Sequence, residues 1–180
     1  MLHADGPGVG VALNAGDCKQ ILRTWFVSGD IDRLLPEVTA LRGVPQPEEF
    51  HPEGDAFIHT MLAVEAVGDG EDQRVFWAVL LHDIGKARTT FFSDGRWRAH
   101  GHAQASADSV PPVMDRLGLP ELVVDVAWLV KNHQYHLSWQ IREGEKLTRR
   151  QKRFTEHPLF PLLERVCAAD EAGRGSSRNI

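Results

Sequence analysis

Hydrophobic residues recur at every third or fourth position along most of this chain of 180 residues. That period is typical of amphipathic helices, and Asp17 is a residue type that can cap a helix at its start. A break or bend is expected at Pro111 and Pro112. The period predicts one helix that begins at Asp17 and others near residues 32–42, 55–67, 71–84, 102–117, 120–132 and 158–172.

The segment 71–84 is nearly continuously apolar after an acidic first turn, which predicts a buried central helix with Gly85 as its C-terminal stop. Asp94 and Gly95 form a turn signal that predicts a loop or short hairpin. Because no extended alternating strands appear, the predicted fold class is all-α.

Length and composition indicate one soluble globular domain, because 42% of the residues are hydrophobic and 25% are charged. We expect a flexible N-terminus over residues 1–14, the domain over 15–172 and a flexible tail over 173–180. The net charge of −5 argues against general binding to duplex nucleic acid, although a local basic patch could still hold a phosphate.

Cysteine usage and hydropathy predict a cytoplasmic location. Cys18 and Cys167 fit a reducing compartment and form neither a disulfide framework nor a zinc motif. No stretch approaches the ~20 apolar residues of a membrane span, and the N-terminus lacks a secretion signal. We therefore expect no membrane contact.

One bound cation could act as the partner of four polar side chains in helical segments: His59, His82, Asp83 and Asp170. A buried carboxylate costs on the order of several kcal/mol unless it is paired or binds a metal. Mixed imidazole and carboxylate ligands suit Mn, Fe, Co, Ni or Mg. Taken singly, each histidine could equally be a surface residue or a hydrogen-bonded core residue. Periodicity does not show that these positions meet in space.

The pattern H…HD…D, formed by those four residues, resembles the metal motif of the HD-domain phosphohydrolase superfamily. Longer blocks resemble the HD domain of bacterial tRNA nucleotidyltransferases, the CCA-adding enzymes, over about residues 17–175. The blocks are "LLPEVTALRGVPQPEEFHPEGDAFIHTMLAVEA" (34–66), "LLHDIGKARTT" (80–90), "HGHAQASA" (100–107) and "RVCAADEAGR" (165–174). The resemblance implies an all-α helical bundle, the HD phosphohydrolase domain, over residues 15–172.

The nucleotide-binding signature of the polymerase half of those enzymes does not occur in this chain, so we do not expect nucleotide addition. The resemblance instead implies a metal-dependent phosphohydrolase of the phosphatase, 2′-nucleotidase or 2′,3′-cyclic phosphodiesterase type. Its expected substrates are nucleotides, 2′,3′-cyclic phosphates or a phosphorylated RNA 3′-end. The resemblance does not indicate an oligomeric state.

Some members of the superfamily hold two metals, so one or two divalent ions are expected. Residues in the right order for a second metal or a phosphate are His102, His133 and Asp55. His100 competes with His102, and we prefer His102 because small residues follow it.

The expected mechanism is attack on phosphorus by a water that the metal activates. Asp83 would hold the metal and orient the water, and Lys86 would offset charge on the phosphoryl group. Judged by its position alone, Lys86 is explained equally well as a residue at the C-terminal end of a helix, where the helix dipole favours a positive charge.

A basic segment, residues 142–153, could attract a phosphorylated substrate through Arg149 and Arg150, although it also fits a solvated surface. Residues that could stack on a base are Trp97, Tyr135 and Trp139. Two alternative functions remain: a cyclic-nucleotide or dinucleotide phosphodiesterase, and a non-catalytic HD module that binds RNA ends or nucleotides.

Overall fold

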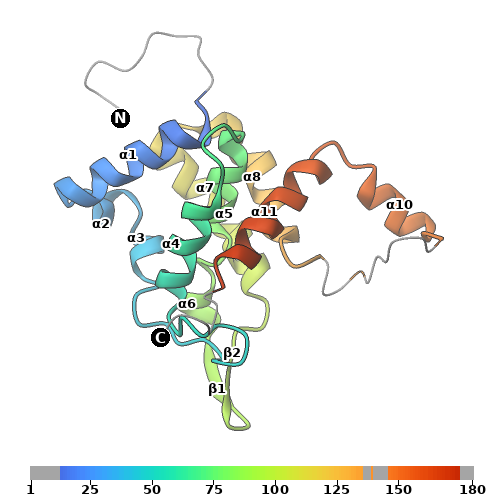
Figure 1. Ribbon diagram of the computed structural model, residues 1–180, viewed down its shortest axis with the longest axis horizontal. Coiled ribbons are helices and arrows are strands. Elements are labelled where there is room, and N and C mark those ends of the chain that lie inside the picture. The colour runs from blue at the N-terminus through green and yellow to red at the C-terminus, as the bar shows by residue number, and fades with distance from the viewer. Residues whose placement is uncertain (1–12, 136–138, 140–145, 175–180) are drawn as a thin grey trace.

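A buried helix, α5 (Gln73–Leu81), runs through the middle of the computed structural model, which describes residues 13–135, 139 and 146–174 (Figure 1). Its residues from Val75 to Leu81 are buried, as the apolar run predicted. The helices packed most closely against it are α1 (Ala15–Ser28), α4 (Ala56–Ala66), α8 (Val123–Asn132) and α11 (Phe160–Ala172).

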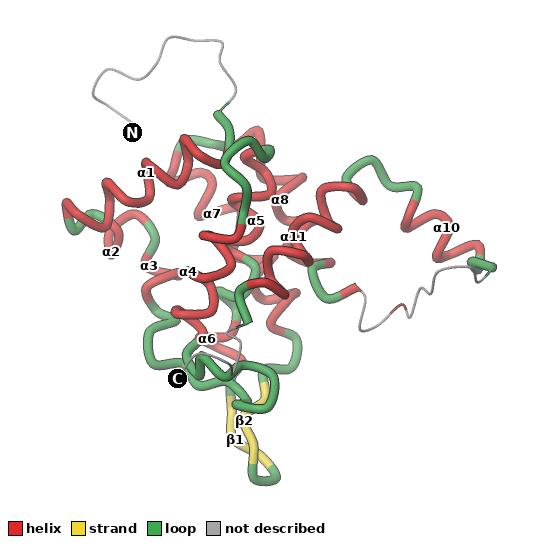
Figure 2. Tube along the Cα trace, viewed as in Figure 1, coloured by secondary structure: helices red, strands yellow, loops and turns green. Residues whose placement is uncertain are grey.

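Helices dominate the described chain, so the predicted all-α class is confirmed (Figure 2). The Asp94-Gly95 turn joins β1 (Phe91–Ser93) to β2 (Arg96–Arg98) in an antiparallel hairpin that projects from one end of the helices. None of the helices in the described ranges is long and apolar enough to cross a membrane. The other elements are α2 (Ile31–Leu34), α3 (Pro36–Thr39), α6 (Lys86–Thr89), α7 (His102–Leu117), the 3-10 helix η1 (Pro120–Leu122) and α10 (Arg149–Thr155).

Short polar side chains determine where the main helices begin. The cap of α1 is Asn14, whose side chain accepts from the Asp17 N–H while the Asp17 carboxylate accepts from the Asn14 N–H. The prediction of Asp17 as the cap was therefore wrong, because Asp17 is the reciprocal acidic residue of a capping box. Asp55 and Asp72 cap α4 and α5.

The predicted helix over residues 32–42 is wrong in extent. The structure has two one-turn helices there, α2 and α3, which are separated at Leu35. Proline disfavours the helical conformation at the residue before it, and Leu35, which precedes Pro36, has φ −134° and ψ 56°. Leu35 and Val38 are still fully buried, so the apolar period marked core residues correctly.

The break expected at Pro111 and Pro112 is also wrong, because α7 continues through both residues. Each proline removes one backbone N–H, and burial of the flanking Val110 and Val113 keeps the helix packed against the core.

Helix α10 was not predicted, although the sequence carries a signal for it. Thr148 and Gln151 form a capping box at its start. Residues 142–145 of the basic segment lie outside the described residues, as do residues 1–12 and 175–180 at the two ends. The predicted flexible ends therefore stay predictions.

An ion pair joins the C-terminal part of α7 to α3. The Arg116 guanidinium donates to both carboxylate oxygens of Glu37, at 2.8 and 2.6 Å, and also to the Leu34 carbonyl. Burial would raise the pKa of Glu37, but the Arg116 guanidinium outweighs it and holds that pKa below its ordinary value.

We expect Glu37→Gln to lower the free energy of unfolding by about 1 kcal/mol at pH 7. The ion pair stabilises the fold above the ordinary glutamate pKa, and this stabilisation is lost as the pH falls through the lowered pKa of Glu37. The difference between variant and wild type should therefore shrink toward acid pH in urea denaturation. Glu49→Gln, at an exposed position, is the control, and a difference independent of pH would contradict the prediction.

Candidate metal centre

Three segments bring His59, His82, Asp83 and Asp170 together in the interior. His59 lies in α4, His82 and Asp83 lie in the turn after α5, and Asp170 lies in α11. His59 Nε2 is 2.9 Å from Asp170 Oδ1, and His82 Nε2 is 3.1 Å from Asp83 Oδ2 and 3.7 Å from Asp170 Oδ1. All four side chains are buried. We call them the first ligand group.

The other carboxylate oxygen of Asp83 faces two more histidines. Asp83 Oδ1 lies 3.2 Å from His102 Nε2 and 3.9 Å from His133 Nε2. Asp83, His102 and His133 form the second ligand group, so the single carboxylate of Asp83 joins both groups. His100 is exposed, with its ring beside Phe91, and is not part of either group.

Backbone carbonyls orient three of these rings. The Nδ1 atoms of His82, His102 and His133 each lie 2.7 Å from the carbonyl oxygen three residues earlier in the chain. A carbonyl can only accept, so each Nδ1 carries a proton, and in the neutral form of the ring Nε2 presents its lone pair. This is the tautomer in which Nε2 can bind a metal.

Burial and the charges in this cluster shift the pKa values of Asp83, His82 and His133. Burial alone would raise the pKa of Asp83, but the charges of His82 and Lys86 hold it well below its usual range. Burial would lower the pKa of His82, but the Asp83 carboxylate outweighs it and raises that pKa to about 8. Burial, together with the charge of His82, lowers the pKa of His133 to about 3. His133 is therefore neutral at pH 7, while a metal would displace a proton from His82.

The residues present fit divalent metal ions. His82 Nε2, His102 Nε2 and Asp83 Oδ1 are buried and lack a well-aligned hydrogen bond within the described part of the chain. Leaving such atoms without a partner is costly, and a cation would satisfy all three. Imidazole nitrogen and carboxylate oxygen are ligands of Mn, Fe, Co and Ni, and of Mg where oxygen dominates.

The segment that carries this cluster matches a known family. The sequence model of the HD domain family matches residues 51–172, which include both ligand groups. The chain belongs to the HD domain family. Its similarity extends to proteins named multifunctional CCA protein: 41% identity over 169 residues in Halorhodospira halophila, 40% over 157 in Alkalilimnicola ehrlichii and 37% over 151 in Neisseria meningitidis.

These alignments cover 87%, 81% and 81% of this chain, respectively. The chain spans less than two fifths of the length of these relatives, namely 39%, 36% and 36%. The likeness to CCA proteins therefore applies to their HD region.

Three sequence-predicted residues lie elsewhere in the HD domain. The carboxylate of Asp55 is occupied by backbone N–H groups: one oxygen accepts from two in the first turn of α4, and the other accepts from Gly43. Arg149 and Arg150 belong to α10, which lies at the outer edge of the molecule in Figure 1. The Arg150 guanidinium lies 4.8 Å from the centroid of the Trp139 ring.

Glu53 is a residue of the site that sequence reasoning missed. Its Oε1 lies 2.8 Å from His59 Nδ1 and 2.9 Å from His51 Nδ1, and its side chain is buried. The carboxylate turns His59 so that Nε2 faces Asp170. Glu53 lies in an irregular loop, where no periodic pattern could have indicated that it reaches a helix residue.

Lys86 lies between the ligand groups and a cavity. Its Nζ is 2.6 Å from Asp83 Oδ2 and also donates to the Gln46 side chain. The cavity has a volume of about 380 Å³, and Lys86, His51 and His102 are among its lining residues. A ligand in this cavity would lie directly beside the second ligand group.

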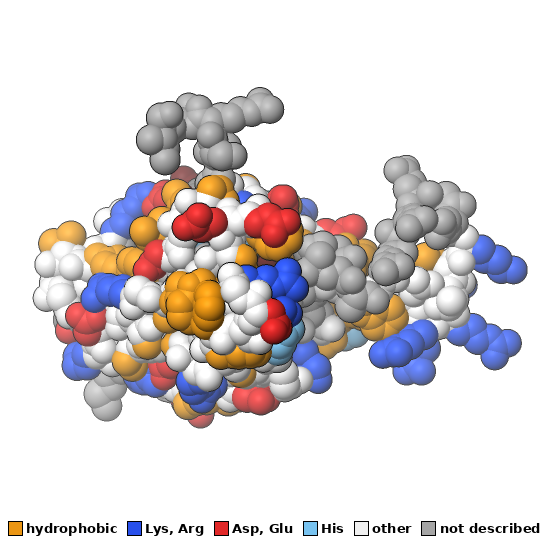
Figure 3. Space-filling view, turned by 90° about the horizontal axis from the view of Figure 1, so that it is seen from below, with side chains coloured by type: hydrophobic (Ala, Val, Ile, Leu, Met, Phe, Trp, Pro, Cys, Tyr) orange, Lys and Arg blue, Asp and Glu red, His pale blue; other side chains and the backbone are white. Residues whose placement is uncertain are grey.

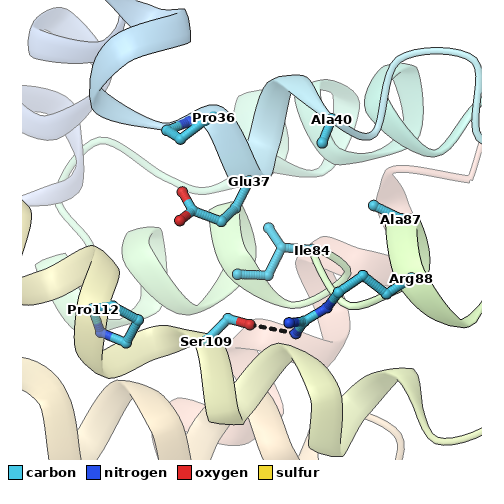
Figure 4. Close-up of a pocket in the computed structure, with 8 residues that line it drawn as sticks. All are labelled: Pro36, Glu37, Ala40, Ile84, Ala87, Arg88, Ser109 and Pro112. Atoms are coloured by element: carbon cyan, nitrogen blue, oxygen red, sulfur yellow. Dashed lines mark hydrogen bonds between the residues drawn. The ribbon is translucent and has the colours of Figure 1, made fainter.

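A second cavity, of about 350 Å³, lies between α3, α6 and α7 (Figure 4). No member of either ligand group lines it. Its charged side chains are already paired: Arg88 donates to the Ser109 hydroxyl at 2.7 Å, and Glu37 binds Arg116. The first cavity is therefore the better candidate for the functional site.

Gly85 lets α7 approach the ligand groups. A Cβ at this position would lie 2.4 Å from the His102 carbonyl oxygen and 2.7 Å from the Ser106 nitrogen. The Ser106 hydroxyl also accepts from the Gly85 N–H at 2.8 Å. Gly85 has φ −65° and starts α6, so the prediction that it stops the preceding helix was wrong. The glycine is needed for close packing of α7.

We expect Glu53→Gln to lower the affinity for Mn²⁺ about 10–100-fold, because His59 loses the carboxylate that orients it. Isothermal titration calorimetry of metal-stripped protein measures this change. Glu48→Gln, an exposed change in the same loop, should leave the affinity unaltered. Equal affinities of Glu53→Gln and wild type would show that Glu53 does not position His59.

We expect Gly85→Ala to lower the free energy of unfolding by about 1–3 kcal/mol or more, because the methyl group meets backbone atoms of α7. The displaced His102 should also weaken metal binding by the second ligand group. Urea denaturation and metal titration measure the two effects. Gly70→Ala, where a Cβ meets nothing within 4 Å, is the control. A variant as stable as wild type would rule out the close-packing role.

Proposed function

We propose that this HD domain is a metal-dependent phosphohydrolase acting on nucleotides, 2′,3′-cyclic phosphates or phosphorylated RNA ends. The observation that carries the proposal is the position of Lys86, which contacts Asp83 on one side and lines an open cavity on the other. A buried metal site of purely structural use needs neither a cavity nor a cation on its rim. The names of the CCA relatives support RNA-linked chemistry.

The ligand groups would hold the ions. The first group would bind one ion through His59, His82, Asp83 and Asp170, and the second group would bind another through the remaining oxygen of Asp83 with His102 and His133. Bound divalent ions lower the pKa of water toward neutrality and polarise phosphoryl oxygens.

Asp83 has the central part in this proposal. Its low pKa keeps it ionised at neutral pH, so both oxygens are available to hold ions. The ionised carboxylate would hold the ions and would accept a hydrogen bond that orients a water for attack on phosphorus. Burial of the ligand groups excludes bulk water that would compete.

Lys86 would stabilise charge that develops on the phosphoryl oxygens. Its ammonium is buried and is held in place by Asp83 and Gln46, so little reorganisation is needed when a phosphate arrives. A preorganised cation of this kind acts most strongly where water is excluded.

We expect hydrolysis of 2′,3′-cyclic AMP or 2′-AMP to require added Mn²⁺, Co²⁺, Ni²⁺ or Mg²⁺, and kcat to fall about 10²–10³-fold in Lys86→Met. Asp83→Asn should lose both turnover and bound metal. Lys152→Met, on exposed α10, is the control. Metal content and melting temperature are measured for every variant.

The same assay separates the alternatives. Preference for 3′,5′-cyclic AMP or a cyclic dinucleotide would favour the other phosphodiesterase class. Stoichiometric metal with no turnover of any phosphate ester would exclude catalysis and leave the non-catalytic binding module.

A further inference from the structure

The cavity beside the second ligand group is open, cationic and aromatic at once. It lies where the β1–β2 hairpin meets the loop before α4, and it reaches Lys86 and His102 at its inner end. Figure 3, which views the molecule from this end, shows hydrophobic, Lys/Arg and His side chains close together. Its volume of about 380 Å³ is at the lower end of ligand sites, so it suits one small molecule rather than two linked ones.

The charge of the cavity favours an anion. Arg96, Arg98, Arg174 and Lys86 line it, and none of its lining residues within the described chain is acidic. The Nε atoms of Arg98 and Arg174 are buried without a hydrogen-bond partner among the described residues. Each of these two guanidinium groups pairs with a carboxylate through a terminal nitrogen, which leaves other N–H groups available.

The aromatic side chains of the cavity are exposed although they are large and apolar. Trp97 is 37% exposed and Phe50 is 52% exposed. The other two predicted stacking residues are engaged in packing: Trp139 stacks on Phe154 at 4.5 Å, and Tyr135 contacts the same ring at 5.5 Å. Trp97 also contacts Phe92, with ring centroids 5.1 Å apart, but it is the one of the three that lines this cavity beside the metal centre.

We propose that this cavity binds the nucleoside part of the substrate, with its base against Trp97 and Phe50 and its anionic groups near Arg174. The proposal rests on the proposed function, since the phosphate ester would then face Lys86 and the second ligand group. It names the substrate class as a single nucleoside phosphate, either a free nucleotide or the terminal nucleotide of an RNA. Aromatic stacking accepts any base, and Arg supplies the charge for the phosphate.

The test separates base binding from phosphate binding. Adenosine and inorganic phosphate are titrated separately into Mg²⁺-loaded protein by calorimetry, because neither can be hydrolysed. Trp97→Ala should weaken adenosine binding about tenfold or more and leave the affinity for phosphate within about twofold of the wild-type value. Trp97→Phe should restore most of the adenosine affinity. Trp97 is partly exposed on a surface hairpin, so the fold should persist, and melting temperatures check this.

Arg174→Gln should show the opposite pattern, because it should weaken phosphate binding and leave adenosine binding unchanged. Arg165→Gln, in α11 and outside the cavity, should change neither. The source of the nucleotide is distinguished by comparing KM for 2′,3′-cyclic AMP with KM for a short RNA that ends in a 2′,3′-cyclic phosphate. Trp97→Ala should lower kcat/KM for the preferred substrate about tenfold.

The two proposals fail in different ways. Absence of adenosine binding, or binding unaffected by Trp97→Ala, would overturn the nucleoside site even if phosphate esters are hydrolysed. Absence of hydrolysis with every ion tested, alongside Trp97-dependent adenosine binding, would overturn the proposed function and support the nucleoside site.

Discussion

The buried carboxylate of Asp83 dictates how the helices around it must assemble. A carboxylate that is 1% exposed costs several kcal/mol unless opposite charge and hydrogen-bond donors surround it. Lys86, at 2.6 Å, and His82, at 3.1 Å, supply positive charge, and histidines from α4 and α7 and from the end of α8 lie at 3.2 to 3.9 Å, where a bound cation would complete the compensation. Because these partners come from separate helices, the charge is compensated only when the bundle is correctly assembled. A metal bound at this site would therefore be coupled to folding.

Close helix packing at two glycines makes that assembly possible. Gly85 brings the start of α7 against the turn that carries Asp83, and a side chain there would collide with the His102 carbonyl. Gly173, at the end of α11, lies so near α4 that a Cβ would be 2.7 Å from the Ala63 nitrogen. Both contacts involve backbone atoms, which cannot move aside as a side chain can. The positions of the metal ligands thus depend on residues that have no functional groups.

The site has a buried part and an open part, and Lys86 and His102 belong to both. Inside, carboxylates and oriented imidazoles favour cations. Outside, the cavity carries arginine and aromatic side chains and favours an anion with a flat apolar group. In the proposed reaction a phosphate ester meets both parts, so the buried groups act on phosphorus while the hairpin holds the remainder of the substrate. The division follows from burial, since only the outer residues can exchange water for a ligand.

The helical class and many core residues could be predicted from the chain alone, because these depend on periodicity and on chemical character. The sequence also placed His59, His82, Asp83 and Asp170 in one motif, through a family resemblance. It could not decide the roles of Asp55, Glu53 or Gly85, which depend on contacts across space. Asp55 caps α4, Glu53 reaches His59 from an irregular loop, and Gly85 accommodates α7. These roles become apparent in the folded chain, because helical periodicity describes one element at a time and carries no information about which atoms of other elements lie opposite it.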